Sequence, residues 1–429
     1  CMEFLRICVE ENFTDVVISI KASNTVVMVK TVRLLVDVME KEGMAFPLHL
    51  GVTEAGDGED GRIKSALGIG ALLSDGLGDT IRVSLSEAPE AEIPVARKLV
   101  DYVLLRQDHP YIPGLEAPEF NYLSPERRKT KAVRNIGGEH VPVVIADRMD
   151  GKTEVNPQFT PDYIYAGRTL PDQREDGVEY ILDADVWQGE AGTWPAFNHA
   201  QLSLMGECNA ELKFLCMPYM AQTDEVRACL QHHPEVVFDA QSNHPNRLGE
   251  HRALVHQLMT EGLQNPVVFF QHYSEDDAEN LQIKSAADMG ALIFDGLCDG
   301  IFLFNQGNLS HAVVDATAFG ILQAGRTRTS KTEYISCPGC GRTLYDLEKT
   351  IARIKAATSH LKGLKIGIMG CIVNGPGEMA DADYGYVGAG RGKISLYKGK
   401  VCVEKNIPEE EAVERLLEFI RTDREENQQ

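Results

Sequence analysis

Short apolar runs alternate with longer amphipathic segments over the first 105 residues. Three aliphatic runs predict buried strands at residues 16–20, 47–52 and 80–85. Apolar side chains at helical spacing predict helices at residues 25–42, 65–74 and 93–105. This order predicts a parallel sheet with crossover helices, either open or closed into a barrel. A barrel needs about eight strands and three precede residue 106, so we expect the C-terminal part of a TIM-type barrel.

A second series of strand patterns follows a loop-like linker at residues 106–135. It predicts strands at residues 141–146, 163–166, 180–182, 212–217, 236–240, 267–270 and 300–304. The segment KSALGIGALLSDGLGD at 64–79 aligns with KSAADMGALIFDGLCD at 284–299, an offset of 220 residues. Such internal similarity indicates a second copy of the same β/α unit. We therefore expect residues 136–325 to form an inserted, barrel-like α/β domain after the partial barrel of residues 1–105.

Residues 326–429 have a mixed pattern that is typical of a compact α+β module. The pattern predicts two helices and three strands, at residues 346–360, 364–369, 394–397, 400–404 and 408–421. Lys398-Gly399 separates the last two strands, which indicates a hairpin. We expect this module to be a third domain.

Charge and cysteine usage narrow the class of protein. With 64 acidic and 42 basic residues the net charge is −22, which argues against nucleic acid as a partner. Ten cysteines follow no regular framework, so we expect free thiols in a reducing, cytoplasmic compartment. No apolar stretch is long enough for a membrane span, so we expect no membrane partner. The chain opens within a helical pattern, which we interpret as an N-terminally truncated sequence.

Polar side chains collect where the predicted strands of the first segment end. In chain order these are Lys21, Glu54, Arg82 and Ser84. In β/α folds this end of the strands carries the chemistry. We also expect Lys64-Ser65 to open the glycine- and alanine-rich helix, where free N–H groups favour an anion. Cations, hydroxyls and a helix terminus facing one pocket would suit a diphosphate, although any single such lysine or arginine is more often a surface ion pair.

Three thiols and one carboxylate carry the chemistry of the C-terminal module. They are Cys337, Cys340, Cys371 and Glu378, set in glycine-rich backbone. A C-x-x-C pair places two sulfurs on one turn, and thiolates select zinc or iron–sulfur clusters. A fourth nearby cysteine is missing, which suggests three thiolates and a weaker oxygen ligand at an exchangeable corner. From the spacing alone, a structural zinc site with a ligand elsewhere and a redox dithiol both remain open.

The strings SCPGCGRT (336–343) and GIMGCIVNGPGE (367–378) resemble the cluster domain of the 4-hydroxy-3-methylbut-2-enyl diphosphate synthase family. The likeness extends to KASN (21–24), HLGVTEAG (49–56), KSALGIG (64–70) and GDTIRVSL (78–85). The resemblance implies a 4Fe–4S cluster whose ligands are Cys337, Cys340, Cys371 and Glu378. It also implies a C-terminal module similar to those of sulfite and nitrite reductases.

The resemblance further assigns the residues at the strand ends. It implies that Lys21, Arg82 and Ser84 bind the substrate's diphosphate and that Glu54 is the acid/base residue. We add Lys64, Ser65 and Asn374 as further substrate-binding candidates. Because an oxygen ligand binds iron less firmly than a thiolate, we expect Glu378 to be a catalytic residue as well as a ligand.

The reaction that the resemblance implies is reductive ring opening of 2-C-methyl-D-erythritol 2,4-cyclodiphosphate to 4-hydroxy-3-methylbut-2-enyl diphosphate, in non-mevalonate isoprenoid biosynthesis. The electron donor would be ferredoxin or flavodoxin. An inserted domain is similar to the family's plant-type and chlamydial-type branch, and a plant-type source would place the protein in the plastid. We expect either a monomer with an in-chain site or a homodimer. The alternative is a non-catalytic iron–sulfur scaffold or electron carrier.

The repeat indicates that the inserted copy has lost this chemistry. With the offset of 220, the four strand-end positions correspond to Gln241, Ser274, Phe302 and Phe304. Amide, hydroxyl and phenyl groups cannot hold a diphosphate as cations do. We therefore expect a structural domain, with a second ligand site as the rival interpretation.

Overall fold

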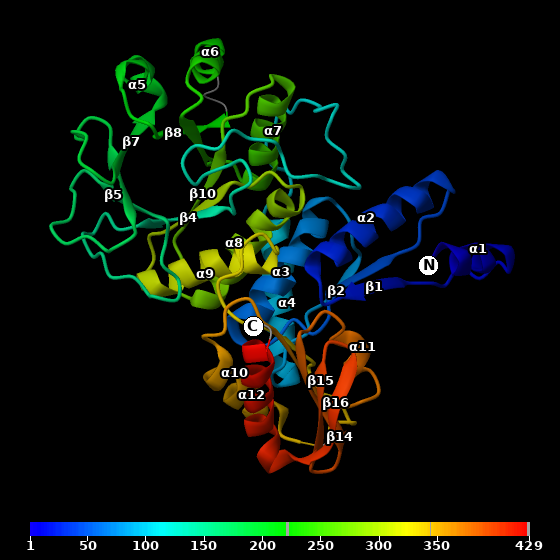
Figure 1. Cartoon of the computed structure of the whole chain (residues 1–429). Helices are drawn as coiled ribbons and strands as arrows, with labels where there is room; N and C mark the ends of the chain where they lie inside the picture. The colour runs from blue at the N-terminus through cyan, green and yellow to red at the C-terminus, as the bar shows by residue number, and fades with distance from the viewer. Residues whose placement is uncertain (220–222, 344, 427–429) are drawn as a thin grey trace. The chain divides into compact units, whose positions relative to one another are not determined.

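The computed structural model describes residues 1–219, 223–343 and 345–426, and it divides into two compact units (Figure 1). Unit 1 combines Cys1–Leu99 with Thr329–Gln429, and unit 2 is Val100–Arg328. The boundary between them falls within helix α4 (Glu92–Leu104). The N-terminal β/α segment and the C-terminal module therefore belong to one unit, and the segment between them forms the other.

The N-terminal part of unit 1 confirms the predicted alternation of strands and helices. Its elements are α1 (Met2–Glu10), β1 (Ile18–Ala22), α2 (Thr25–Lys41), β2 (Leu48–Val52), α3 (Gly58–Ser74) and β3 (Thr80–Arg82). The strands form a parallel sheet in the order β1-β2-β3. Asn24 caps α2 by accepting hydrogen bonds from two backbone N–H groups of its first turn.

The C-terminal part of unit 1 is a mixed five-stranded sheet in the order β12-β13-β14-β15-β16. The elements are β12 (Glu333–Ser336), α10 (Leu347–Thr358), β13 (Lys365–Met369), α11 (Gly375–Glu378), β14 (Tyr384–Gly390), β15 (Lys393–Lys398), β16 (Val401–Pro408) and α12 (Glu409–Glu426). The first three strands are parallel, and β14, β15 and β16 pair antiparallel. Ile351 of α10, Ile366 of β13 and Leu416 of α12 share one buried core.

Unit 2 contains a closed barrel of eight parallel strands, in the order β10-β11-β4-β5-β6-β7-β8-β9. The strands are β4 (Val143–Asp147), β5 (Tyr163–Gly167), β6 (Glu179–Asp183), β7 (Thr193–Asn198), β8 (Lys213–Pro218), β9 (Val236–Gln241), β10 (Val267–Tyr273) and β11 (Gly300–Asn305). The helices are α5 (Leu202–Glu207), α6 (Asp224–His232), α7 (Arg247–Thr260), α8 (Ala278–Phe294) and α9 (His311–Ala324). In the fully described stretch from β4 to β7, loops without a helix connect the strands. The sequence did not predict β7, because Pro195 interrupts its apolar pattern.

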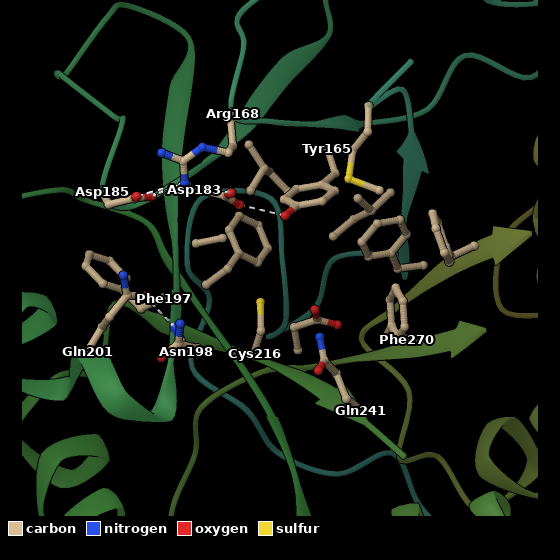
Figure 2. Close-up of a pocket in the computed structure, with 18 residues that line it drawn as sticks. Tyr165, Arg168, Asp183, Asp185, Phe197, Asn198, Gln201, Cys216, Gln241 and Phe270 are labelled. Carbon is tan, nitrogen blue, oxygen red and sulfur yellow. Dashed lines mark hydrogen bonds and ion pairs between the residues drawn. The ribbon is translucent and has the colours of Figure 1, made fainter. Parts of the chain in front are cut away.

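The internal repeat is confirmed at the level of elements. Helix α8 begins and ends 220 residues after the corresponding ends of α3. Strands β9, β10 and β11 are neighbours in the barrel, as β1, β2 and β3 are in the sheet of unit 1. The carboxyl end of the barrel encloses a cavity of about 440 Å³, at the position that corresponds to the strand ends of unit 1 (Figure 2).

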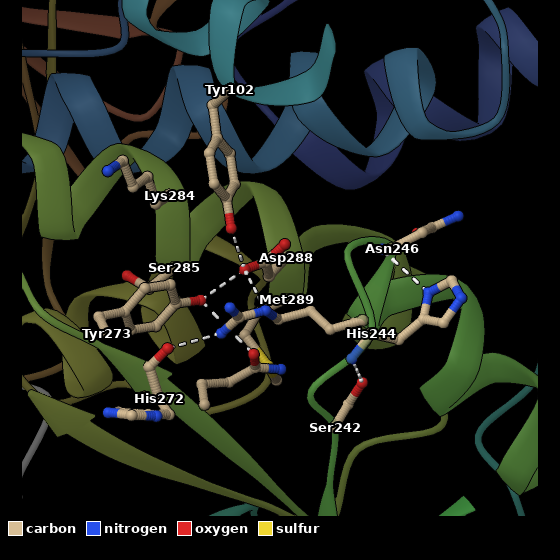
Figure 3. A network of polar contacts seen from close by, with 12 residues as sticks. Tyr102, Ser242, His244, Asn246, His272, Tyr273, Lys284, Ser285, Asp288 and Met289 are labelled. Atoms are coloured by element: carbon tan, nitrogen blue, oxygen red, sulfur yellow. Dashed lines mark hydrogen bonds and ion pairs between the residues drawn. The ribbon is translucent and has the colours of Figure 1, made fainter. Parts of the chain in front are cut away.

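A buried carboxylate on α8 joins three elements of unit 2 (Figure 3). Asp288 is fully buried and accepts hydrogen bonds from Tyr102 Oη (2.6 Å), Tyr273 Oη (2.6 Å) and Arg106 Nη2 (2.7 Å). Its charge is balanced by Arg106 and, at 3.6 Å, by Nε of Arg247. Burial beside this carboxylate raises the pKa of Tyr102 and Tyr273, so both hydroxyls stay protonated donors.

Candidate active site

Two cations flank a glycine in one row of the unit 1 sheet. Parallel pairing sets Lys21 opposite Gly51, and Gly51 opposite Arg82. A Cβ atom at position 51 would lie 3.2 Å from Cε of Lys21 and 3.1 Å from the carbonyl oxygen of Arg82. The missing side chain therefore leaves room for the lysine to lie over the strand. Burial and, to a smaller extent, the nearby charge of Arg82 lower the pKa of Lys21.

Glu54 follows β2 in a strained and buried position. Its backbone is left-handed, with φ of 49°, which non-glycine residues seldom adopt. Its side chain is 6% exposed, and Oε2 has no hydrogen-bond partner among the described residues. Burial raises the pKa of Glu54 to about 7; a hydrogen bond with Thr53 opposes the rise and the charge of Glu378 adds to it. The carboxyl group can therefore give or take a proton near neutral pH.

The three thiols lie on loops that follow β12 and β13. Cys337 comes directly after β12, Cys340 lies three residues on, and Cys371 follows β13 after one glycine. The N–H of Gly370 donates to Sγ of Cys337 (3.2 Å), and the N–H of Arg342 donates to Sγ of Cys340 (3.4 Å). Burial raises the pKa of Cys337, whereas the N–H of Arg342 lowers the pKa of the exposed Cys340.

One cavity of about 220 Å³ in unit 1 brings most of the sequence-predicted residues together. It is lined by side chains from both ends of the sequence: Glu54, Arg82, Ser84, Cys337, Cys340, Cys371, Asn374 and Glu378. Ser84 is buried, Glu378 is half-buried on the short helix α11, and Asn374 is exposed just before it. Lys21 is not one of the lining residues, but its charge acts on the carboxyl of Glu54.

Several polar contacts connect the β/α segment of unit 1 to the C-terminal module. The hydroxyl of Ser86 bonds to both the carbonyl oxygen (3.0 Å) and the hydroxyl (2.8 Å) of Ser336, the residue before Cys337. Ala55, the residue after Glu54, forms a β-bridge with the same Ser336. Lys331 forms half-buried ion pairs with Glu59 (2.6 Å) and Asp60 (2.7 Å) of α3. These contacts fix the loop of Glu54 beside the loop of Cys337.

The expectation that Lys64 and Ser65 open a helix is wrong. Helix α3 begins at Gly58, so both residues lie inside it, where their backbone N–H groups are not free to bind an anion. Both are buried, and Nζ of Lys64 bonds to Glu333 (3.2 Å) and to the carbonyl oxygen of Tyr334 (3.3 Å). Neither lines the cavity of about 220 Å³. Lys64 therefore connects α3 to β12, and neither residue offers the free helix-terminal N–H groups on which its assignment to the substrate rested.

Sequence reasoning missed two residues on β2. Gly51 leaves space for the side chain of Lys21. The only signal for this in the sequence is a glycine inside an apolar run. His49 lies on the same face, two residues earlier, and its Nδ1 is 2.8 Å from Oγ1 of Thr80. Burial, Lys21 and Arg82 all lower the pKa of His49, so this imidazole stays neutral beside the two cations.

The thiol-bearing loops offer a donor set that fits an iron–sulfur cluster. Among the described residues, no three His, Cys, Asp or Glu side chains converge closely enough to bind a single metal ion. A 4Fe–4S cluster spreads its protein ligands over four irons and so needs a wider arrangement. The donor set fits such a cluster, because three sulfurs and the carboxylate of Glu378 line one cavity and two of the sulfurs accept backbone N–H bonds.

The fold and the site together define a class of protein. A β/α barrel segment that presents cations and a carboxyl group beside a thiol-lined module is typical of an iron–sulfur oxidoreductase. Residues 1–97 match the GcpE TIM-barrel domain, and residues 333–422 match the GcpE protein C-terminal domain. The chain belongs to the 4-hydroxy-3-methylbut-2-en-1-yl diphosphate synthase (flavodoxin) family.

Three bacterial relatives carry that family name. The protein of Bacteroides thetaiotaomicron is 93% identical over 426 residues, which are 99% of this chain and 70% of the relative. That of Bacteroides fragilis is 82% identical over 98% of this chain and 67% of its own length. That of Parabacteroides distasonis is 60% identical over 98% of this chain and 69% of its own length. In the part of the chain that the structure describes, no helix is long and apolar enough to span a membrane.

Proposed function

We propose that this chain carries out the reaction named for its relatives: it converts 2-C-methyl-D-erythritol 2,4-cyclodiphosphate to 4-hydroxy-3-methylbut-2-enyl diphosphate and water. The reaction takes up two electrons and the protons that balance them. The observation that carries the proposal is the single cavity that joins three thiols to Glu54, Arg82 and Ser84 within one chain. This supports an enzyme over the alternative of a non-catalytic iron–sulfur scaffold or electron carrier, because a scaffold has no use for diphosphate-binding cations.

Lys21, Arg82 and Ser84 would bind and orient the diphosphate. Arg82 offers a planar set of donors that suits phosphate oxygens, and Lys21 adds a point charge in the same row of the sheet. Ser84 is buried and lines the cavity, so its hydroxyl can donate to an oxygen without competition from solvent. Together these groups would stabilise the negative charge that develops on the phosphate when the ring opens.

Glu54 would supply the proton that leaves with the hydroxyl group as water. A carboxyl group with a pKa near 7 is partly protonated at neutral pH, which a general acid requires. Its burial excludes solvent from the proton, and the unpartnered Oε2 is free to contact a substrate oxygen. Asn374, on the opposite loop, offers an amide to the same space.

Cys337, Cys340, Cys371 and Glu378 would hold a 4Fe–4S cluster, which when bound supplies the one-electron transfers that side chains cannot perform. The relatives are named for flavodoxin, and we propose flavodoxin over ferredoxin as the electron donor. Because the relatives are bacterial, we also propose a cytoplasmic location.

The test is made on anaerobically purified protein. Iron and sulfide analysis with an absorption spectrum should give about four irons per chain and a brown protein. The same sample, given a chemical reductant and the cyclic diphosphate, should release the linear diphosphate. Cys371→Ser should lose iron and turnover together, whereas Arg82→Lys should keep the iron and raise KM. A colourless protein that contains one zinc per chain would reject the proposal.

A further inference from the structure

The barrel of unit 2 contains a cavity that the proposed function does not use. It has a volume of about 440 Å³, within the range of small-molecule sites. Its rim is formed by the last residues of three strands, Asp183 of β6, Asn198 of β7 and Gln241 of β9 (Figure 2). The carboxyl end of such a barrel is where ligands of this fold bind. The packed core of the barrel, with Tyr163, Val237 and Val268, begins below it.

This cavity lies where the repeat would place a second substrate site. With the offset of 220, Lys21, Arg82 and Ser84 correspond to Gln241, Phe302 and Phe304, and all three of these line the cavity. The position of a site is therefore retained, although its cations are replaced. A cavity that had become purely structural would be filled by large apolar side chains, as the layer below it is.

The charge of the lining is the reverse of that in unit 1. Among the described residues that line the cavity, three are acidic, Asp183, Asp185 and Asp239, and one, Arg168, is basic. Arg168 is engaged at the rim, where its Nη1 lies 2.8 Å from Asp185 and 3.8 Å from Asp183. Asp183 also accepts a hydrogen bond from Tyr165 Oη (2.6 Å), a neutral donor that leaves its charge unchanged. With one cation for three carboxyl groups, the lining repels phosphates and favours a cation.

Asp239 provides a buried carboxylate that lacks a full set of partners. It lies on β9 opposite Cys216 of β8, one layer below the rim, and is 4% exposed. Its Oδ1 has no hydrogen-bond partner in the described parts of the chain. Burial raises the pKa of Asp239 to about 7, and hydrogen bonds from Cys216 and Gln241 lower the pKa by less than burial raises it. A buried carboxylate is costly unless something pairs with it, which points to a ligand that donates to this oxygen.

Aromatic side chains of β10 and β11 line the cavity beside Asp239, because its strand β9 is the neighbour of β10. Phe270 and Phe304 stack with centroids 5.8 Å apart, and Phe302 meets Phe270 edge-on at 5.0 Å. Tyr165 lies edge-on to Phe302 at 5.8 Å. The faces of such rings attract cations, and their area suits an apolar body. A cavity that combines carboxylates with the faces of aromatic rings can bind an organic ammonium group.

We propose that the barrel of unit 2 binds a small organic amine, with the ammonium group on Asp239 and Asp183 and the apolar part against Phe270, Phe302 and Phe304. The inserted domain would then be a binding domain of opposite charge preference to the catalytic unit, and not the structural domain that the sequence alone predicts. The inference stands apart from the proposed reaction, because every residue in it belongs to unit 2.

The test is calorimetric titration of the whole chain with phenethylamine at about pH 8, where Asp239 is ionised. Two isosteres serve as probes of charge, 2-phenylethanol and phenylacetate. The amine should bind about tenfold or more tightly than the alcohol, and phenylacetate should not bind. Asp239→Asn should weaken the amine about tenfold and abolish its advantage over the alcohol. Asp172→Asn makes the same charge change at an exposed position outside the cavity and should leave binding unaltered.

A second variant, Phe304→Ala, tests the proposal independently in case Asp239→Asn does not fold. Phe304 is only half-buried, so Phe304→Ala should fold normally, as judged by its melting curve, and bind the amine several-fold more weakly. Glu54→Gln, in unit 1, should bind the amine like the unmodified chain. The proposal is overturned if the amine shows no binding up to about 10 mM, if the alcohol binds equally well, or if folded Asp239→Asn keeps full affinity.

Discussion

At the scale of single residues, Glu54 combines a strained backbone with a buried carboxyl group. Its φ of 49° and its unpartnered Oε2 both reduce stability, and both are found beside the thiols. Strain of this kind persists where the surrounding contacts hold it, here the β-bridge between Ala55 and Ser336. In this conformation the carboxyl group lines the cavity.

Replacing Glu54 by glycine should therefore stabilise the protein while removing its activity. Glycine adopts a positive φ freely, so Glu54→Gly should raise the free energy of unfolding by about 1 kcal/mol, as strain relief exceeds the entropy cost of glycine. Turnover should fall by about 100-fold or more, since the proton donor is gone. Denaturant unfolding and steady-state rates measure the two effects. Glu54→Gln is the control, because it removes the proton but keeps the strain; a glycine variant less stable than the glutamine variant would contradict the argument.

The pKa of Glu54 sets the expected pH dependence. Its pKa is raised from 4.5 to about 7, mainly by burial, so the protonated donor is present below this value and is lost as pH rises through it. The value of kcat/KM should be constant at pH values below the pKa of Glu54 and should fall about tenfold per pH unit above it. The profile of Glu54→Gln should lack this alkaline limb and be low throughout. An unchanged limb in that variant would assign the titration to another group.

At the scale of elements, a glycine in β2 decides how the cations are presented. Gly51→Ala would place a Cβ atom 3.1 Å from the backbone of Arg82 and 3.2 Å from Lys21, so the lysine must move. We expect KM for the cyclic diphosphate to rise about three- to tenfold with little change in kcat, because the loss is in binding. Iron content should be unaffected. Gly390→Ala is the matched control, since a Cβ there meets no atom within 4 Å. Equal kinetics for both variants would refute the role of Gly51.

Within unit 2, Asp288 is expected to be indispensable for stability. Asp288→Ala leaves the buried guanidinium of Arg106 without its carboxylate and removes the 2.6 Å acceptor of both tyrosine hydroxyls, so that Tyr273 keeps only the longer bond to Gln271 (3.5 Å). Breaking such a pair should lower the free energy of unfolding by about 3–5 kcal/mol. The exposed control Asp172→Ala should change it by less than about 0.5 kcal/mol. Comparable losses in the two variants, measured by urea unfolding, would show that the network is dispensable.

The sequence predicts those features that depend on residues close together in the chain, and it misses those that depend on contacts between distant segments. Strand and helix periodicity located most elements, and the 220-residue offset located the second copy of the β/α unit. Periodicity missed β7, where Pro195 breaks the pattern, and it also missed β12 and the glycine-rich β14. It misplaced the start of α3, because Gly58 and Gly61 mask a helix that tertiary packing stabilises. The thiols and strand-end cations were identified from motifs. The left-handed Glu54, the space at Gly51 and the aromatic cavity depend on contacts between distant segments, and no local pattern encodes them.

At the scale of the whole molecule, the two proposed binding sites belong to different units. All proposed iron ligands lie in unit 1, whereas Asp239 and the aromatic cavity lie in unit 2. A ligand stabilises the part of a protein that binds it. Filling or emptying each site should therefore change the stability of the unit that contains it. The division also explains how one copy of the repeat can change its charge preference without disturbing the other.

Removing iron should separate the two units experimentally. Anaerobic chelation should speed amide hydrogen exchange about tenfold or more around the loops after β12 and β13, and leave β8 and β9 unaltered. Phenethylamine should have the opposite pattern, slowing exchange in β8 and β9 and leaving the thiol loops unaltered. Each treatment is therefore the control for the other, in one sample of unmodified chain. Iron removal that loosened both units equally would mean that the cluster stabilises the barrel of unit 2 as well, and the two sites would have to be treated as coupled.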